Sequence, residues 1–482
     1  MLNYKVIFNI VGFLLILDGI AMMLGIPFSI YYGDDDILVL LFSGVGTSLI
    51  GFVLYYLTQS SNKDIRKREG YIVVSLGWLV MTIFGAIPFV IYGAIPSYTD
   101  AFFETMSGFT TTGASILNNI ESIPHGLLFW RSLTQWLGGM GFIVLSLAIL
   151  PILGIGGMQL FIAEVPGPTK DKIHPRVRET AKRLWGIYVL FTVAEIILLF
   201  VGGMGFFDSI CHSFTTMATG GFSTKQSSIA YYTSPFIQYV IVLFMFLAGA
   251  NFSLHYYWLH RKIKHVTRNE EFRFYFYLIV GFTLLIFFGR VFNSTLGVEL
   301  TFRESLFQVV SMITTTGFVS ADYEMWGVFF HVIFFLLLFI GGSAGSTGGG
   351  IKVVRHLILI KNSALELRRL IHPRAVIPVR FNGSTVSQDI VLNIMAFLLF
   401  YIAIFIFGSL VMSFIGLDFL TSMGAVATSL GNVGPAIETV GPVDNFAHIP
   451  DIGKWFLSFL MLMGRLELFT VLIIFSPAFW KK

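Results

Sequence analysis

The stretch TMSGFTTTGAS, residues 105–115, places three consecutive threonines and a glycine between long apolar segments of the chain. Three similar stretches follow: SFTTMATGGFST at 213–224, SMITTTGFVS at 311–320 and ATSLGNVGPA at 427–436. Each is rich in small residues and contains a glycine, at which the main chain can adopt dihedral angles that a β-carbon forbids. Four such stretches in one chain predict a structure built from four repeats.

The composition places these stretches in an all-α integral membrane protein. Of the 482 residues, 55% are hydrophobic and 12% are charged, whereas about a quarter of the residues of a soluble protein are charged. The single cysteine, Cys211, excludes an internal disulfide and a cysteine-based zinc site. Apolar residues form ten blocks near the ~20 residues that a helix needs to cross a bilayer. The blocks lie near 6–26, 37–58, 71–93, 127–157, 185–207, 236–259, 272–292, 328–360, 390–416 and 455–476.

Charge predicts the orientation of the chain in the membrane. Five basic zones follow every second apolar block and hold 22 of the 31 lysines and arginines. Since basic loops stay in the cytoplasm, both termini are expected there. The opposite loops are acidic and include the run Asp34-Asp35-Asp36. These carboxylates either concentrate cations at the outer mouth or only keep the loops soluble. The basic zones are residues 63–68, 170–183, 261–273, 361–380 and 481–482.

Each small-residue stretch follows an acidic residue and a moderately apolar segment. Asp100 precedes Gly113 by 13 residues, and Asp208 precedes Gly220 by 12. Glu304 precedes Gly317 by 13 residues, and Asp418 precedes Gly434 by 16. These segments are too short to cross the bilayer and return, so we expect half-helices that enter from outside. An acidic residue at the start would stabilise the amides of the first helical turn.

The stretch after each half-helix is expected to return as extended chain. Extended backbone is tolerated at membrane depth only where it is buried in protein or lines a cavity. Four such segments around one axis would present rings of carbonyl oxygens, which can replace the hydration shell of a monovalent cation. One stretch alone would also fit a close helix contact, where threonine and glycine are common. Four of them predict a selectivity filter.

These motifs resemble the Trk/Ktr/HKT superfamily of potassium and sodium transporters, and most closely its bacterial Trk-type potassium uptake membrane subunits. The resemblance covers nearly the whole chain, including an extra helix pair before the first repeat. It extends to GGMGFIVLSLAILPILGIGGMQL at 138–160, EVPGP at 164–168, GGSAGSTGGGIKV at 341–353, HPRAV at 372–376 and MGRLELFTVLI at 463–473.

The resemblance implies that backbone carbonyls before four glycines bind potassium. The implied residues are Thr111, Thr112 and Gly113; Ala218, Thr219 and Gly220; Thr315, Thr316 and Gly317; and Asn432, Val433 and Gly434. The four segments differ in sequence, so the ring is expected to be asymmetric. In the superfamily a serine in place of the first glycine goes with sodium conduction, and glycine at all four positions favours potassium.

The eighth apolar block is interrupted by GGSAGSTGGG at 341–350, which no regular helix accommodates well because each glycine costs about 1 kcal/mol relative to alanine. We expect a mobile loop below the filter that gates the pore, as the resemblance also implies; the alternative is a static kink for close packing. The glycines are Gly341, Gly342, Gly345, Gly348, Gly349 and Gly350, and Lys352 beside them is expected to anchor the loop.

Arg465 lies ten residues into the last apolar block. A buried arginine in a membrane helix is costly and usually faces a cavity or a partner. We expect it to place a charge in the permeation path below the filter, as the resemblance implies. The alternative is a structural contact with Glu467 or with loop carbonyls.

The repeats predict five parts of the chain: an N-terminal transmembrane helix pair at 1–62 and pore repeats at 63–170, 171–265, 266–372 and 373–482. The resemblance implies a homodimer that binds a cytosolic ring of nucleotide-binding regulatory subunits. We expect contact with membrane lipid, no nucleic-acid partner, no cofactor in this chain and K⁺ as the transported ion.

Three other functions are considered. Two keep the fold: a sodium-selective channel, and a potassium carrier coupled to sodium or protons. The third is an intramembrane hydrolase, because Gly341, Ser343 and Gly345 fit the G-x-S-x-G pattern of a nucleophile elbow. That pattern needs a positioned base, and the sequence does not place His331 or His356 beside the serine. We therefore expect a transporter and not an enzyme.

Overall fold

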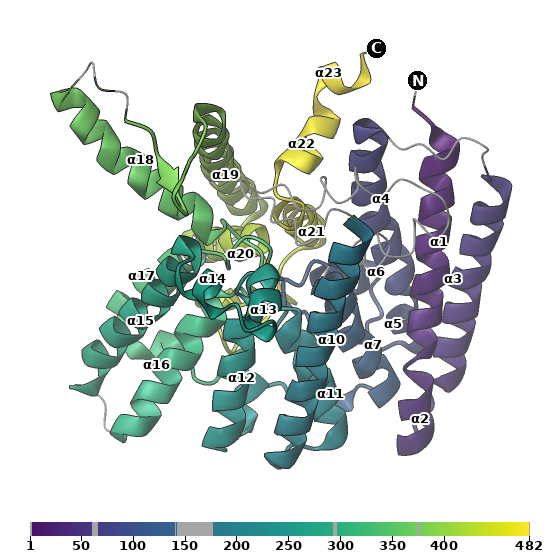
Figure 1. The fold of residues 1–482 in the computed structure, drawn as a ribbon. Helices are drawn as coiled ribbons and strands as arrows, with labels where there is room; N and C mark the ends of the chain where they lie inside the picture. The colour runs from purple at the N-terminus through teal and green to yellow at the C-terminus, as the bar shows by residue number, and fades with distance from the viewer. Residues whose placement is uncertain are drawn as a thin grey trace.

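The computed structural model describes residues 2–59, 66–139, 141, 177–292, 296–372, 375 and 377–481. This part of the chain is almost entirely helical (Figure 1). Its one sheet is a hairpin of β1 (Arg380–Phe381) and β2 (Ser384–Thr385). The expected all-α membrane fold is confirmed.

The N-terminal helix pair forms as expected. Helix α1 (Tyr4–Met23) continues into α2 (Ile26–Tyr32) and packs along α3 (Ile37–Leu57). The two backbones approach so closely that a β-carbon on Gly12 would lie 2.8 Å from the Gly51 carbonyl oxygen. Small residues that let helices approach are typical of helix pairs in lipid. The pair lies against α4 at the edge of the molecule.

Four repeats of outer helix, half-helix and inner helix follow the N-terminal pair. The first contains α4 (Lys67–Gly85) with α5 (Ile87–Tyr92), then α6 (Tyr98–Phe109) and α7 (His125–Gly139). The second contains α10 (Val177–Val201), α11 (Phe206–Met217), and α12 (Pro235–Ala248) with α13 (Phe252–Leu259). The third contains α15 (Glu270–Val291), α16 (Val298–Ile313), and α17 (Val328–Leu337) with α18 (Val353–Ile371). The fourth contains α19 (Gln388–Ile415), α20 (Phe419–Gly431), and α21 (Asp451–Arg465) with α22 (Phe469–Phe475).

Short elements join and end these repeats. Single helical turns follow the half-helices as η1 (Ile120–Ser122), η2 (Ser228–Tyr231), η3 (Tyr323–Trp326) and η4 (Glu438–Val440). Helix α14 (Ile263–Thr267) precedes the third repeat, and α23 (Pro477–Trp480) ends the described chain.

The inner helices are not the straight spans that the apolar blocks suggested. The chain bends by 104° between α12 and α13 and by 116° between α21 and α22. The third inner helix is interrupted after Leu337, as the glycines predicted. Six described helices are long and apolar enough to cross a membrane, or eight if each bent pair is one span. Most of the block 127–157, the motif at 164–168 and residues 170–176 of the second basic zone lie outside the described residues.

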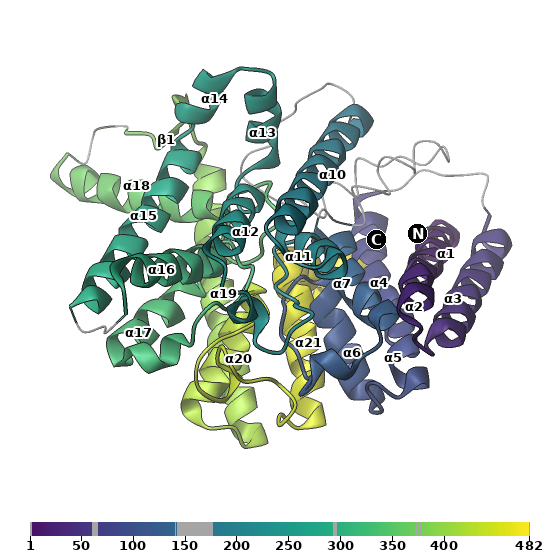
Figure 2. The same cartoon turned by 90° about the horizontal axis from the view of Figure 1, so that it is seen from below.

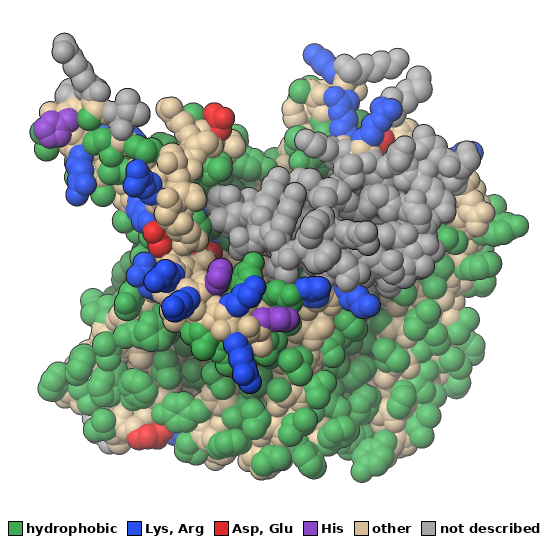
Figure 3. Space-filling view, in the orientation of Figure 1, with side chains coloured by type: hydrophobic (Ala, Val, Ile, Leu, Met, Phe, Trp, Pro, Cys, Tyr) green, Lys and Arg blue, Asp and Glu red, His purple; other side chains and the backbone are tan. Residues whose placement is uncertain are grey.

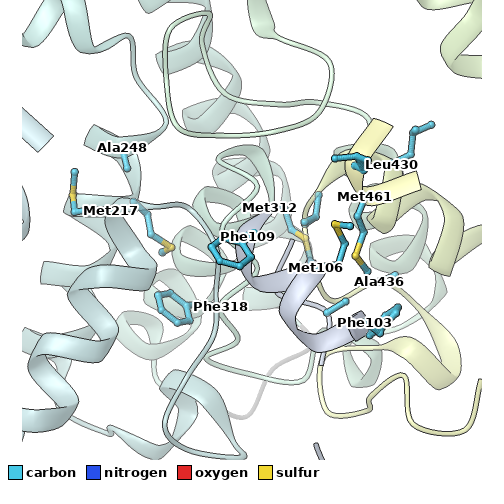
Figure 4. Packing of buried hydrophobic residues seen from close by; sticks show 14 of the residues in the cluster. Phe103, Met106, Phe109, Met217, Ala248, Met312, Phe318, Leu430, Ala436 and Met461 are labelled. Carbon is cyan, nitrogen blue, oxygen red and sulfur yellow. The ribbon is translucent and has the colours of Figure 1, made fainter. Parts of the chain in front are cut away.

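The four repeats follow one another around the molecule in chain order (Figure 2). Inner helix α7 packs on the next half-helix α11, and α12 packs on α16. Helix α21 of the last repeat packs on α6 of the first. Phe103 and Met106 of α6 lie close to Met461 of α21 in this contact (Figure 4). The repeats therefore form a closed ring.

The outer surface fits a bilayer. Hydrophobic side chains cover the lower part of the molecule in Figure 3, whereas Lys and Arg gather toward the upper end. The N- and C-terminal ends of the described chain both lie at this upper end (Figure 1). The molecule is a multi-pass membrane protein with a basic end that carries both termini.

Candidate functional site

All four half-helices end in the same backbone turn. In each, one non-glycine residue adopts a left-handed conformation, which costs an L-residue about 1–2 kcal/mol. The four residues are Thr111, Thr219, Thr315 and Asn432, with φ of 52°, 53°, 58° and 53°. The next N–H donates to the carbonyl five residues earlier, as in a Schellman turn. These bonds are Thr112 to Ser107 (2.9 Å), Gly220 to Thr215 (2.8 Å), Thr316 to Ser311 (2.9 Å) and Val433 to Thr428 (3.1 Å).

The shared turn corrects the register expected for the second repeat. The glycine that adopts positive φ lies two residues after the left-handed residue. These glycines are Gly113, Gly221, Gly317 and Gly434, with φ of 83°, 77°, 78° and 102°. Gly221 therefore takes the place expected for Gly220, and Ala218 is the C-cap of α11. From the sequence, the first glycine of the Gly-Gly pair was expected to match Gly113. The end of α11 shows that the second glycine, Gly221, matches it. We call residues 111–113, 219–221, 315–317 and 432–434 the four filter segments.

The filter segments contact one another through these glycines. A β-carbon on any of the four would lie within 3.0 Å of a carbonyl oxygen in the next segment, so no other residue fits without movement. Gly113 meets the Gly220 carbonyl, Gly221 that of Thr316, Gly317 that of Val433, and Gly434 that of Thr112. The contacts run from the first segment to the fourth and back to the first. Carbonyls at one equivalent position thus form a closed ring.

The hydroxyls of Thr112 and Thr316 bond to the ends of their own half-helices. The hydroxyls of Thr110 and Thr112 lie 2.8 Å apart, as do those of Thr314 and Thr316. Such bonds hold each side chain against the end of its own half-helix. The contacts that all four segments share are made by carbonyl oxygens.

The acidic residues before the half-helices differ more than expected. Asp418 is the N-cap of α20, and hydrogen bonds from Thr421 lower the pKa of its carboxyl. Asp100 and Asp208 lie in the first turns of α6 and α11, as expected. Glu304 does not begin α16, whose first turn holds Glu299.

The acidic loop residues also make specific contacts that the sequence did not reveal. Asp34 accepts a bond from the N–H of His125 (2.7 Å), and Asp36 accepts one from the N–H of Leu127 (3.0 Å). These two carboxylates therefore join the N-terminal pair to the first turn of α7. Asp35 accepts a bond from the Tyr92 hydroxyl at 2.7 Å. In this run the carboxylates hold helices together.

A buried ion pair behind the ring was missed in the sequence. Glu104 of α6 accepts a hydrogen bond from Nε of Arg131 of α7 at 2.8 Å, and both side chains are almost fully buried. Glu104 also accepts bonds from the Ser115 hydroxyl (2.9 Å) and the Ile116 N–H (2.8 Å). The pair thus holds the chain that leaves the first filter segment. The sequence did contain a signal for this pair, because a charged residue within an apolar segment, such as Arg131, usually has a partner.

The glycine-rich loop lies against the inner ends of the half-helices. Its Thr347 donates from the hydroxyl to the Met217 carbonyl at the end of α11 (3.0 Å). The Gly349 N–H donates to the hydroxyl of Thr315 (2.7 Å). A β-carbon on Gly349 would lie 2.7 Å from the β-carbon of Asn432. The loop therefore contacts three of the four repeats directly below the filter segments.

Arg465 contacts this loop. It is the last residue of α21, where the chain bends, and not the middle of a continuous helix as expected. Its guanidinium donates to the Thr347 carbonyl (2.7 Å) and to the carbonyls of Gly138 and Gly139 at the end of α7, the latter at 2.8 Å. Arg465 thus joins the loop to the first repeat.

Two neighbouring cations complete the contacts around the loop. Lys352 donates from Nζ to the Gly348 carbonyl, which ties the base of the loop to its tip. Glu467, weighed from the sequence as a partner of Arg465, forms an ion pair with Arg355. Loop carbonyls, the other alternative partner, do accept bonds from Arg465.

The hydrolase hypothesis has no support in the described residues. Ser343 is buried and its hydroxyl lacks a hydrogen-bond partner there. His356 bonds through Nε2 to the Phe339 carbonyl, and His331 bonds to the Glu324 carbonyl. A nucleophile elbow needs a base next to its serine. The described part of the chain also contains no group of three His, Cys, Asp or Glu residues that could hold a metal ion.

Comparison with known proteins decides the family. Residues 39–482 match the family described as TrkH, cation transport protein. The chain belongs to this family. Among its TrkH-family relatives is the Trk system potassium uptake protein TrkH of Escherichia coli K12, 42% identical over all of both chains. Another is the Trk system potassium uptake protein TrkG of the same strain, 36% identical over 99% of each chain.

A solved structure in the TrkH family has the same fold. The crystal structure of the potassium transporter TrkH from Vibrio parahaemolyticus aligns over 100% of both chains, with 37% identity and a TM-score of 0.89. The resemblance found in the sequence motifs is thereby confirmed. The matched family is described as a cation transport protein, which is not an enzyme class.

Proposed function

We propose that this protein takes up potassium selectively across the bacterial cytoplasmic membrane through the ring of the four filter segments. The observation that carries this proposal is the closed set of contacts in which a glycine of each segment meets a carbonyl of the next. The TrkH and TrkG relatives are named potassium uptake proteins, which supports potassium as the substrate.

The ring supplies the chemistry that a dehydrated monovalent cation needs. Carbonyl oxygens from four segments replace water around K⁺ without adding formal charge, so the ion is bound weakly enough to leave. The half-helices end at the filter segments, and the C-terminal end of a helix carries partial negative charge that favours a cation. Gly113 in the first segment supports K⁺ over Na⁺, because the resemblance associates serine there with sodium.

The glycine-rich loop 341–350 is the gate in this proposal. It lies below the filter segments and contacts Thr315 and Asn432, so it obstructs the inner side of the ring. Arg465 restrains the loop through the Thr347 carbonyl and adds positive charge near the pathway. Opening requires release of these few contacts, which glycines permit because their backbone adopts many conformations.

We further propose that the basic end of the molecule faces the cytoplasm. Lys and Arg gather toward the end where both termini lie, as basic segments do on the inner side of membranes (Figure 3). The same end would bind a cytosolic nucleotide-binding regulatory subunit, and the protein would act as a homodimer, as the resemblance implies. The transported K⁺ is substrate, and the chain needs no cofactor for this function.

Ion flux in reconstituted liposomes tests the proposal. With opposed K⁺ and Na⁺ gradients, we expect the reversal potential to follow K⁺, and Gly113→Ser to shift it toward Na⁺. The same variant should weaken growth of an uptake-deficient host at low potassium. A reversal potential that follows Na⁺, or flux that requires a Na⁺ or proton gradient, would replace the proposal with a sodium-selective or coupled transporter of the same fold.

A further inference from the structure

One position in the carbonyl ring lacks a side chain. The residues that supply the ring carbonyls are Thr112, Gly220, Thr316 and Val433. Gly220 is not among the glycines with positive φ. Its backbone would therefore accept another residue, so conformation does not explain this glycine.

The space beside Gly220 is occupied by a side chain from the preceding repeat. A β-carbon on Gly220 would overlap the amide of Gln135, which is fully buried on α7. Gln135 donates from Nε2 to the Gly220 carbonyl (2.6 Å) and accepts from the Phe222 N–H at Oε1 (3.0 Å). One partner needs a donor and the other an acceptor, so together they fix which way the amide points.

Arg131, one helical turn earlier on the same face of α7, extends this contact. It donates from Nη1 to the Ser223 carbonyl (2.9 Å), and its guanidinium lies 3.6 Å from the centre of the Phe222 ring. Helix α7 therefore binds the second filter segment and the chain that leaves it. In the first and third segments, Thr112 and Thr316 instead bond to a threonine of their own half-helix.

We propose that Gln135 is a positioning residue for ion selectivity, which sets the Gly220 carbonyl in the ring from the neighbouring repeat. This inference rests on the proposed function of the ring. Gln135 fills the space beside the residue that has no side chain, and its amide bonds the ring carbonyl directly, whereas Thr112 and Thr316 bond through their hydroxyls to Thr110 and Thr314. Selectivity depends on the placement and number of the carbonyls around the ion. Release of one carbonyl should therefore let the ring adapt to Na⁺.

The first test replaces the amide and keeps the side-chain length. In Gln135→Met, the K⁺ to Na⁺ permeability ratio of the full-length protein in liposomes should fall about tenfold, the scale of one lost hydrogen bond to a buried polar group. The matched control is Gln238→Met. Gln238 is a buried glutamine on the next inner helix, α12, and bonds to the Tyr232 carbonyl away from the filter. The control should keep the wild-type ratio.

The second test gives the second segment the threonine found in the first and third segments and then shortens Gln135. Gly220→Thr alone should lower the permeability ratio, because the new side chain collides with Gln135. Adding Gln135→Ala should restore part of the ratio, since the threonine side chain then fits the space that the amide leaves, while Ala218 gives it no hydroxyl partner like Thr110. A residue that only filled space would change thermal stability in both variants without this reversal of selectivity.

The outcomes separate the two proposals. If wild-type protein shows no preference for K⁺, the proposed function fails and this inference fails with it. If wild type prefers K⁺ and Gln135→Met folds with an unchanged ratio, only the inference is overturned. If Gln135→Met does not yield folded protein, the Gly220 pair decides: partly restored selectivity in the double variant supports the inference, and an unrestored ratio overturns it.

Discussion

Asn432 of the fourth repeat donates a hydrogen bond from Nδ2 to the hydroxyl of Thr112 in the first repeat, at 2.9 Å. The same amide donates to the Met461 carbonyl of α21, also at 2.9 Å. Asparagine suits this site for a second reason, because its short polar side chain tolerates the left-handed backbone found there. A fourth segment without threonine therefore closes the ring with a different group.

Asn432→Ala should destabilise the protein and weaken uptake. The change removes both donors and leaves a left-handed alanine, a combined loss of roughly 1–3 kcal/mol. A lower melting temperature in detergent and slower growth at low potassium are the expected readouts. The control is Asn445→Ala, since that amide bonds to the exposed Asn118 side chain outside the ring. Equal effects of the two substitutions would contradict the role assigned to Asn432.

The register of the second segment predicts different behaviour for its two glycines. Gly221→Ala should impair potassium flux as severely as Gly113→Ala, because a β-carbon there meets the Thr316 carbonyl and the backbone has positive φ. Gly220→Ala meets only the Gln135 side chain and should be rescued by Gln135→Ala. Liposome flux of the three glycine variants, and of the Gly220→Ala and Gly221→Ala variants combined with Gln135→Ala, checks this. Rescue of Gly221→Ala by Gln135→Ala would show that the register is wrong.

The buried pair of Glu104 and Arg131 should respond strongly to loss of one charge. Glu104→Gln leaves the arginine buried without its counterion, which costs about 3–5 kcal/mol in comparable pairs. Thermal unfolding should show a large loss, partly recovered by adding Arg131→Met.

A more exposed ion pair provides the comparison for this prediction. Glu366 and Arg369 of α18 form an ion pair in which 54% of the glutamate side chain and 31% of the arginine side chain are exposed. Glu366→Gln should cost about 1 kcal/mol or less, because solvent screens the pair. A smaller effect of Glu104→Gln than of Glu366→Gln would contradict the assigned burial.

Arg465→Gln should increase potassium flux through the closed protein. The shorter neutral side chain loses charge-assisted bonds to the Thr347 carbonyl and to Gly139, so the glycine-rich loop is less restrained. Flux without any regulatory subunit, compared with wild type at equal protein density, measures the effect. Arg369→Gln, on the exposed part of α18, is the control. Reduced flux in Arg465→Gln would contradict a restraining role.

Ser343→Ala should leave potassium flux within about twofold of wild type, because the change removes a buried hydroxyl that makes no hydrogen bond in the described chain. The hydroxyl has no hydrogen-bond partner among the described residues. Flux and melting temperature should both be retained. Loss of a hydrolytic activity in this variant would instead revive the nucleophile-elbow interpretation.

The sequence predicted the large features of the fold because they depend on patterns. Long apolar blocks and four repeated stretches were enough for the membrane class and the ring of four repeats. The break after Leu337 followed from glycine content. The bend at Arg465 was not predicted, although Gly464 precedes it, because one glycine is tolerated inside a helix. The structure shows that Gly464 packs against the Leu430 carbonyl at this point, a contact that the sequence does not reveal.

The parts of the site that the sequence did not predict depend on contacts between distant residues. In the sequence, either Gly220 or Gly221 could be the glycine that matches Gly113. Only the end of the helix after Met217 shows that it is Gly221. Likewise, nothing near Gln135 in the sequence indicates that its amide binds a backbone carbonyl in the next repeat. Such pairings require the fold to be known.

The closing contact between Gly434 and the Thr112 carbonyl has a consequence for how the protein is made. Synthesis proceeds from the N-terminus, so the first half-helix reaches the membrane long before the fourth. Until residues beyond Gly434 have emerged, the Thr112 carbonyl has no neighbour on one side. A chain truncated before the fourth repeat would therefore leave the proposed potassium path open on one side.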